Sequence, residues 1–424
     1  MGILKELTKE YFGEKVRKED DINIDGLDVE IVSFTDNNGK KHKKGYKPND
    51  RVALKNLLKR MIEVRGDEGD FNDIDTSEIK SMMMLFDGNK TFNGDISGWD
   101  VSEVEDMSYM FEDATSFNQD ISKWDVSKVT DMCYMFENAT SFNQPIGEWT
   151  FPTVFYMDNM FECATSFNQD ISKWEFPEVK SMGFMFNGAT SFNQKISDWE
   201  FPNVTNMNYM FCGATSFNQP IGDWKFPNVE DMCGMFSGAT SFNQDISKWE
   251  FPDVKDMKYM FSGATSFNQP IGDWKFPNVI YISYMFRNAT SFNQDISKWE
   301  FPEVTDMCGM FNGATSFNQP IGDWKFPKVT DMEGMFKDAK SFNQPIGDWK
   351  FPKVITMCSM FNGATSFNQD ISKWNLSNVT DMNSMFYGAI SFNQDISNWD
   401  IRGVHNFLMF INCPIKDEFK PKME

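Results

Sequence analysis

The side chains that most often carry out chemistry are few and widely separated in this sequence. Only two of the 424 residues are histidines, His42 in a lysine-rich stretch and His405 near the C-terminus. The sequence contains no nucleophile elbow, phosphate loop, Cys-x-x-Cys motif or calcium-binding Asp-rich loop. Acidic residues are numerous but recur at a fixed interval along the chain, whereas an active site requires one asymmetric cluster. We therefore expect a protein that is not an enzyme and that holds no cofactor or metal ion.

Cysteine chemistry is limited by the same periodicity. Cys133, Cys233, Cys308 and Cys358, four of the seven cysteines, fall at one position of the repeat. The closest two, Cys308 and Cys358, are two repeats apart, or about 10 Å if each repeat advances about 4.8 Å. That separation exceeds the reach of a disulfide bond, so free thiols are expected.

Tryptophan offers another kind of chemistry, because exposed aromatic rings stack on sugars. All 13 tryptophans share one position of the repeat, and a column of exposed rings would form a glycan-binding platform. In stretches such as residues 174–176, however, Trp and Phe alternate with a charged residue, which is typical of the buried face of a strand. The favoured prediction is a structural core, and the glycan platform is kept as an alternative. The predicted core column is Trp124, Trp149, Trp174, Trp199, Trp224, Trp249, Trp274, Trp299 and Trp324.

The repeat itself indicates which elements position these side chains. Written once, it reads F-N-Q-[DP]-I-x-x-W-x-[VF]-x-x-V-x-x-M-x-x-M-F-x-x-A-x-S. Residues 174–176 show the alternation of a strand, and apolar residues in 179–189 recur at i, i+3, i+6, i+7 and i+10, which predicts one face of a short helix. A Ser or Pro between them, such as Ser127 or Pro177, favours a helix start. Each repeat is therefore expected to be a strand, a tight connection, a short helical turn and a return loop.

One such unit cannot bury its own Ile, Trp, Phe and Met side chains, but a stack of units can. The predicted fold is an α/β repeat solenoid, with one long parallel sheet on one side and short helical turns on the other, capped at both ends. A recurrent asparagine (Asn118, Asn143, Asn168) is predicted to form an internal ladder that satisfies main-chain groups of neighbouring repeats.

Charged residues flank each tryptophan and are expected to point outward from this sheet. Two repeat subtypes, Q-D-I-S-K-W-E and Q-P-I-G-D-W-K, mostly alternate, so opposite charges follow each other along each column. This alternation predicts salt-bridge ladders, and charge compensation is favoured over a partner-specific code. The candidate interaction face consists of Lys173, Glu175, Asp223, Lys225, Lys248, Glu250, Asp273, Lys275, Lys298, Glu300, Asp323 and Lys325.

The ends of the chain depart from the repeat, as capping units must. The expected parts are an N-terminal extension of a helix and a hairpin (1–45), an N-terminal capping helix (46–70), a solenoid of about thirteen repeats (71–400), and a C-terminal cap with a charged tail (401–424). In the C-terminal cap, Phe407, Phe410 and Ile411 are expected to replace the Met, Met and Phe of the repeat.

The net charge of -22 argues against nucleic acid and anionic membrane surfaces as partners, because both select basic patches. Residues 1–70 carry 15 of the 40 basic and 15 of the 62 acidic residues, so the negative charge belongs to the repeats. The charged N-terminus lacks the apolar stretch of a signal peptide, and no segment approaches the length of a transmembrane helix. We expect no membrane insertion.

The unit F-N-x-D-I-x-x-W-D-V-S-x-V-x-x-M-x-x-M-F resembles the 25-residue repeat of BspA-like leucine-rich-repeat surface proteins of mycoplasmas, spirochaetes and anaerobic bacteria. The lead-in from Tyr46 through the helix to residues 71–77 also matches that family, and the resemblance covers residues 46–415. It implies a leucine-rich-repeat-like solenoid, a cell-surface or secreted location, and a role in adhesion or host binding.

These observations predict a protein-interaction or adhesion scaffold that presents an extended acidic surface. The expected partner is a protein or a matrix or host macromolecule of unknown identity, and the chain is expected to be a monomer or to self-associate weakly. A self-assembling structural protein is the alternative from another class.

Overall fold

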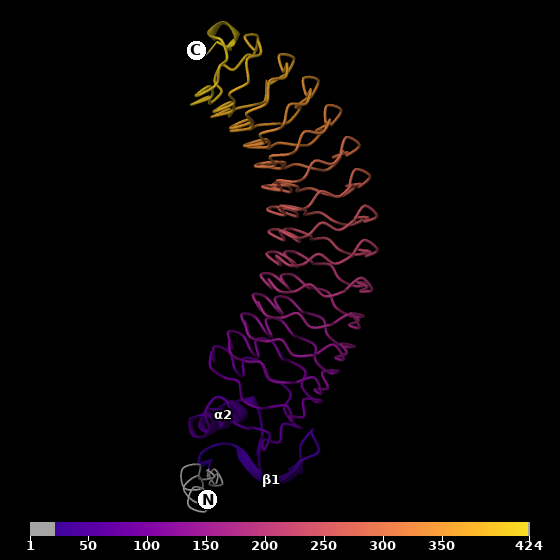
Figure 1. The fold of residues 1–424 in the computed structure, drawn as a ribbon, viewed down its shortest axis with the longest axis vertical. Coiled ribbons are helices and arrows are strands. Elements are labelled where there is room, and N and C mark those ends of the chain that lie inside the picture. The colour runs from indigo at the N-terminus through magenta and orange to yellow at the C-terminus, as the bar shows by residue number, and fades with distance from the viewer. Residues whose placement is uncertain (1–21, 423–424) are drawn as a thin grey trace, which may run out of the picture.

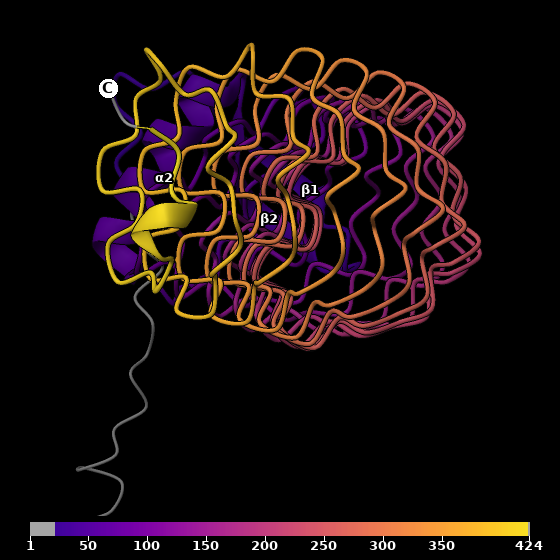
Figure 2. The same ribbon diagram turned by 90° about the horizontal axis from the view of Figure 1, so that it is seen from above.

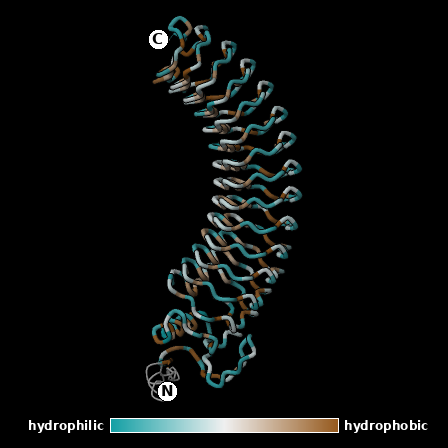
Figure 3. The backbone as a smooth tube through the Cα atoms, in the orientation of Figure 1, coloured by the Kyte–Doolittle hydropathy of each residue, from teal (hydrophilic) through white to brown (hydrophobic). Residues whose placement is uncertain are grey.

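The computed structural model describes residues 22–422, in which each repeat makes one coil and the coils stack along the longest axis of the molecule (Figure 1). Viewed along the stack, successive coils follow the same outline (Figure 2). The same order of polar and apolar residues recurs from coil to coil (Figure 3). The protein is therefore a repeat solenoid. Its regular elements are strand β1 (Val29–Thr35), strand β2 (Lys41–Pro48), helix α2 (Arg51–Arg65) and the 3-10 helix η1 (Asp417–Phe419).

Within residues 22–422 the repeats do not form the predicted long parallel sheet: a ladder of isolated parallel bridges joins the coils, and it runs through a different part of the repeat from the predicted strand. Bridges recur once in each repeat, as in Asp231 to Asp256 and Asp256 to Tyr281. Around each bridge, N–H groups donate to carbonyls of the next coil, for example Met232 to Asp256 at 3.0 Å and Phe236 to Met260 at 2.9 Å. We call these stretches, such as residues 255–263, the ladder segments.

The structure corrects the elements predicted for the repeat. The expected helical turn is the ladder segment, and the expected Trp strand is a turn in which the Trp249 N–H donates to the Ile246 carbonyl at 3.1 Å. The three-residue spacing of apolar side chains comes from successive tight turns, such as Met260 N–H to Met257 O and Ala264 N–H to Phe261 O. Within residues 22–422 no α-helix lies in the repeats. Turns and a helix place every third side chain on one face, so the pattern alone did not separate them.

The core runs the whole length of the stack. All 13 tryptophans are at most 5% exposed, and the Phe, Met, Ile and Val positions of the repeat are buried with them. The Trp249 Nε1–H donates to the Ile221 carbonyl of the preceding coil at 3.0 Å. The predicted asparagine ladder is present, since Asn243 Oδ1 accepts the Asn268 N–H at 2.9 Å and the Gln269 amide at 3.0 Å. These bonds satisfy buried polar groups that a single coil could not satisfy alone.

The stack is curved, and the spacing of equivalent rings shows towards which side. Ring centroids lie 4.5 Å apart for Tyr109 and Tyr134 in the ladder segments, but 6.4 Å apart for Trp199 and Trp224. Coils that are closer on one side must bend towards it, so the ladder lies on the concave side of the arc in Figure 1. We call the solvent-facing side chains of the ladder segments, most of which are partly buried, the ladder face, and the exposed side chains of the Trp turns the outer face.

The N-terminal end is closed by α2 and the hairpin. Asp50 caps α2 by accepting the Ala53 N–H at 2.8 Å. The side chains of Leu54, Leu57, Leu58 and Met61 are buried against the first coil. The helix thus lies where the sequence predicts a capping helix.

Strands β1 and β2 pair antiparallel and form the hairpin predicted for the N-terminal extension, with the turn between residues 35 and 41. The Asn37 N–H donates to the Gly98 carbonyl at 2.8 Å, which fastens the hairpin tip to the solenoid. Next to this contact His42 is buried with its Nε2 2.8 Å from Asp36 Oδ2. The helix predicted ahead of the hairpin lies outside the described residues.

The C-terminal cap differs from its prediction by a small shift in register. The bridge from Asp381 reaches His405, whereas a full repeat would place its partner at position 406, so the last coil is shorter than the others. Met409 is buried and Phe410 stacks on Phe386 at 5.7 Å, whereas Phe407 is 73% exposed. The predicted replacements are therefore wrong by one position: Met409 and Phe410 continue the Met and Phe columns, while Phe407 and the 44% exposed Ile411 are turned outward because the coil is shorter.

Candidate interaction surfaces

The charged residues predicted as the interaction face are all exposed on the outer face. The column that precedes Trp forms ion pairs between adjacent coils, with Lys248 Nζ 2.9 Å from Asp223 Oδ1 and Lys298 Nζ 2.8 Å from Asp273 Oδ1. In the column that follows Trp, the six candidate residues make no ion pair within residues 22–422. The six are Glu175, Lys225, Glu250, Lys275, Glu300 and Lys325. The predicted ladder of salt bridges therefore forms in one column only.

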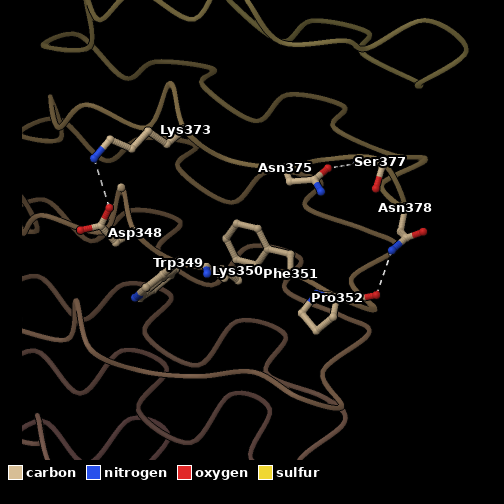
Figure 4. A pocket seen from close by; sticks show the side chains of 10 residues that line it. Asp348, Trp349, Lys350, Phe351, Pro352, Lys373, Asn375, Ser377 and Asn378 are labelled. Carbon is tan, nitrogen blue, oxygen red and sulfur yellow. Dashed lines mark hydrogen bonds and ion pairs between the residues drawn. The ribbon is translucent and has the colours of Figure 1, made fainter.

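Shallow grooves lie between adjacent coils of the outer face, because the coils are widely spaced there. One of them, about 600 Å³, is lined by residues 347–352 of one coil and by Lys373, Asn375, Ser377 and Asn378 of the next (Figure 4). Its rim carries the Lys373–Asp348 ion pair at 3.3 Å and the bond from Asn378 Nδ2 to the Pro352 carbonyl at 2.8 Å.

The tryptophan rings do not line these grooves as a stacking platform. Trp349 and Phe351 are at most 4% exposed, so only ring edges reach solvent. A sugar needs an open ring face for stacking, and the column offers none. The alternative of an aromatic glycan platform is therefore wrong for these side chains.

The ladder face varies from coil to coil far more than the rest of the repeat. This variation is visible in the sequence. The spacing of apolar residues predicts a helical turn at these positions, however, and they were not among the predicted interaction residues. At the position of Tyr259 the coils carry Tyr109, Tyr134, Asn159, Phe184, Tyr209, Gly234, Tyr259, Tyr284, Gly309, Gly334, Ser359 and Ser384. At the position of Ser262 they carry Glu112, Glu137, Glu162, Asn187, Cys212, Ser237, Ser262, Arg287, Asn312, Lys337, Asn362 and Tyr387.

The aromatic side chains of the ladder face stand on strained backbone. Tyr109 has φ 58° and Tyr259 has φ 57°, the left-handed region that glycine occupies without strain and does occupy at Gly234. A bulky residue there costs about 1–2 kcal/mol. Neighbouring rings stack in parallel and recover part of this cost. The stacked pairs are Tyr109–Tyr134 at 4.5 Å, Phe184–Tyr209 at 4.8 Å and Tyr259–Tyr284 at 5.0 Å.

Two glycines make room for tyrosine rings that lean across to the next coil. A Cβ atom on Gly234 would lie 2.3 Å from the Tyr209 ring, and one on Gly309 would lie 2.3 Å from the Tyr284 ring. The thiol of Cys233 then donates to the Tyr209 hydroxyl at 3.4 Å. Tyrosine, cysteine and glycine thus form one packing unit across two coils.

The cysteines are free, as expected, and their thiols are not activated. Burial raises the pKa of Cys233 to about 11 and that of Cys308 to about 12. Since the thiolate is the nucleophile, these residues are weak nucleophiles at neutral pH.

Three glutamates of adjacent coils form an acidic row on the ladder face. Burial, and then the neighbouring charges of Glu162 and Glu112, raise the pKa of Glu137 to about 7. Glu162 is held by amide groups, including Asn187 Nδ2 at 2.6 Å. Within residues 106–163 the ladder segments beside this row contain no lysine or arginine. The basic residues in that range are Lys123, in the Trp turn, and Lys128, which pairs with Glu103 on another part of the coil.

The structure offers no obvious metal centre or membrane-spanning segment in the part of the chain that it describes. Within residues 22–422 no group of three or more His, Cys, Asp or Glu side chains is placed to hold a metal ion. No helix in the same range has the length and apolar character needed to cross a membrane.

The repeats match a known family model. The model described as "Mycoplasma protein of unknown function, DUF285" matches residues 53–174, 145–241, 220–324, 269–354 and 305–419, which together cover most of the chain. The protein belongs to this family. In this DUF285 protein, the matched range begins in α2 and ends at η1, so it coincides with the capped solenoid.

No curated protein sequence matches this DUF285 chain. Among solved structures, the crystal structure of a TLR13–ssRNA13 complex shares 9% sequence identity with it, covering 87% of this chain and 57% of that one, with a TM-score of 0.24. The chain thus spans just over half the length of that structure. A TM-score this low carries no argument about fold or ligand.

Proposed function

We propose that this DUF285 protein is a non-enzymatic interaction scaffold that binds another macromolecule on its concave ladder face. The single observation that carries the proposal is where the coils differ. The core and the outer face repeat two subtypes, whereas the ladder face presents a different set of side chains on nearly every coil. A surface needed only for stacking has no reason to vary in this way, and a binding surface does.

The strained tyrosines support this proposal. Glycine fits the same position in other coils without strain, so stability alone does not favour Tyr109, Tyr134 or Tyr259 there. Tyrosine is enriched in binding surfaces because it offers a large, rigid contact area with a polar end.

The charge of the ladder face favours a protein partner with a basic surface. On the outer face, lysines of the column that precedes Trp pair with acids of the adjacent coil, as Lys248 does with Asp223, but Glu112, Glu137 and Glu162 have no such cation in their row. A complementary potential would speed association and select the partner. Nucleic acid is disfavoured by the same charge. The finer proposal of an adhesin on a cell surface, like the BspA-like proteins that the repeat resembles, rests on that resemblance.

The proposal is tested by comparing matched variants in binding. In the ladder-face variant Tyr109→Gly and Tyr134→Gly, the new residue is one that other coils carry at that position. In the outer-face variant Glu175→Lys and Lys225→Glu, the net charge is unchanged. The natural chain and the two variants are each immobilised, and the partners that they bind from host-cell surface extracts are captured by cross-linking. The affinity of each purified partner for the three proteins is then measured.

The ladder-face variant is expected to lose at least tenfold in affinity for a specific partner, and the outer-face variant to keep it. The reverse pattern would place the interaction on the charged outer residues and overturn this proposal. A partner bound equally by all three proteins would do the same.

A further inference from the structure

The last coil of the ladder leaves a row of main-chain donors without partners. In the coil two before it, ladder N–H groups donate to carbonyls of the next coil, as Met357 does to Asp381 at 2.9 Å and Ser359 to Asn383 at 2.8 Å. The equivalent N–H groups of the last coil have no hydrogen-bond partner within residues 22–422. They belong to Asn406, Leu408, Phe410 and Asn412.

This edge presents four main-chain donors, and the carbonyls of the first three of these residues are used inside the coil. The carbonyl of Asn406 accepts the Met409 N–H at 3.2 Å, and those of Leu408 and Phe410 are likewise used inside the coil. An ordinary strand edge alternates donors and acceptors, so it can pair with a copy of itself. Two edges of the present kind would bring N–H groups face to face, which excludes direct end-to-end pairing of two C-terminal ends.

The N-terminal end of the ladder has the opposite polarity and is sealed. Helix α2 lies over this end, where Arg51 Nη1 donates to the Met83 carbonyl of the ladder and Lys55 Nζ to the neighbouring Met84 carbonyl, both at 2.7 Å. A second copy could reach the donor edge only with its N-terminal end, and α2 covers that end. The donor edge is therefore left for a different polypeptide.

Apolar side chains lie beside the free donors. Phe407 is 73% exposed, Leu408 42% and Ile411 44%. The tail does not cover them, because it follows another side of the last coil, where the Ile396 N–H donates to the Phe419 carbonyl and the Lys416 N–H to Asn393 Oδ1. An open edge with an apolar row is the pattern by which sheets accept an added strand.

We propose that this C-terminal edge, formed by residues 405–412, is a strand-addition site for another polypeptide. Its occupant turns main-chain carbonyls towards the four donors and packs apolar side chains on Phe407, Leu408 and Ile411. A segment with the sequence of the repeat's own ladder meets the first requirement, since every interior coil presents its carbonyls to the preceding coil in this way. In residues 378–390 Tyr387 also supplies a ring at the position equivalent to Ile411.

The probe for the test is a synthetic peptide with the sequence of residues 378–390, and its control is a scrambled peptide of the same composition. Hydrogen exchange is followed by mass spectrometry on the full protein with and without peptide. The ladder peptide should slow exchange at least tenfold in fragments that contain residues 406–412 and leave residues 381–388 unchanged. The scrambled peptide should slow neither.

A variant with Phe407→Asn, Leu408→Gly and Ile411→Ser removes the apolar row while using residues that other coils carry at the same positions, as in Asn383, Gly234 and Ser262. It should fold like the natural chain and bind the peptide at least tenfold more weakly. Ile390→Thr is the matched control, because Ile390 is 61% exposed on the coil whose donors are already paired.

Absence of protection at 406–412, or equal protection by the scrambled peptide, would overturn the proposal. So would unchanged peptide binding by the triple variant. Concentration-dependent growth in light scattering without peptide, lost in the triple variant, would show that a second copy occupies the edge instead.

Discussion

The ammonium group of Lys248 lies 2.9 Å from the carboxylate of Asp223, which stands at the equivalent position one coil earlier. Both side chains are mostly exposed, so the pair holds two coils together only weakly and salt screens it. Lys248→Glu should lower the free energy of unfolding slightly at low ionic strength, and added salt should recover much of the loss. Urea unfolding at low and high salt measures both effects.

The matched control for this prediction is Glu250→Lys. Glu250 is on the same turn but makes no ion pair in the described chain, so this change should have little effect at either salt concentration. A loss for Lys248→Glu that does not depend on salt would contradict the electrostatic explanation.

Trp249 should contribute to stability both by burial and by its hydrogen bond to the Ile221 carbonyl. Trp249→Ala leaves a cavity and should cost about 3–5 kcal/mol. Trp249→Phe keeps most of the apolar volume but leaves the carbonyl unpaired, so its cost should be smaller. Urea unfolding measures the two costs, and iodide should quench little of the native tryptophan fluorescence. Strong quenching of the native protein would show that the rings are exposed.

The asparagine ladder should be more important for stability than other amide contacts between coils. Asn243→Ala leaves the partly buried Asn268 N–H without its acceptor, whereas the Gln269 amide keeps its bond to the Asn243 carbonyl at 2.9 Å. A buried donor without a partner costs about 1–3 kcal/mol, so a cost towards the lower end of that range is expected. Asn278 also bonds to the preceding coil, through the Pro252 carbonyl, but it is exposed. Asn278→Ala should therefore change the unfolding free energy little. Equal effects of the two substitutions in urea unfolding would argue against a special role for the ladder.

The row of Glu112, Glu137 and Glu162 should make stability depend on pH. The pKa of Glu137 is raised from 4.5 to about 7 in the folded protein, so the folded state holds this proton more tightly than the unfolded state. Its ionisation therefore lowers stability progressively as the pH rises from about 4.5 to about 7, with the full loss present above that range.

Glu137→Gln removes this ionisation. Relative to the natural chain, the variant should gain stability at pH 8 and should not gain at pH 4. Thermal unfolding at the two pH values measures the difference, with Glu175→Gln on the outer face as the control for a general charge effect. A gain for Glu137→Gln that is the same at both pH values would contradict the predicted titration.

Several features were predictable because they depend only on which residues recur. The strict period implied stacked coils, since neither Trp249 nor Met257 could be buried by one repeat. The asparagine that recurs at one position of the repeat, as in Asn118 and Asn143, implied a ladder because its amide can hydrogen-bond main-chain groups of neighbouring coils. The apolar face of residues 50–65, ahead of Gly66, implied a helix over the N-terminal end. The ladder face was not singled out as a candidate surface, because the three-residue spacing predicts a helical turn at its positions.

The sequence by itself determined that this protein is a capped stack of repeated coils with a continuous core of Trp, Phe, Met and Ile. Only the tertiary structure decided which segment of the repeat forms the ladder. Three-residue spacing is produced equally by a helix and by successive tight turns, and the choice is made where residues such as Tyr259 adopt a left-handed backbone that lets each coil bond to the next. The curvature of the stack was also decided by the tertiary structure. It depends on the difference between ring spacings of 4.5 Å in the ladder segments and 6.4 Å in the Trp turns. That difference exists only once the coils are stacked, and it places the variable side chains together on the concave face.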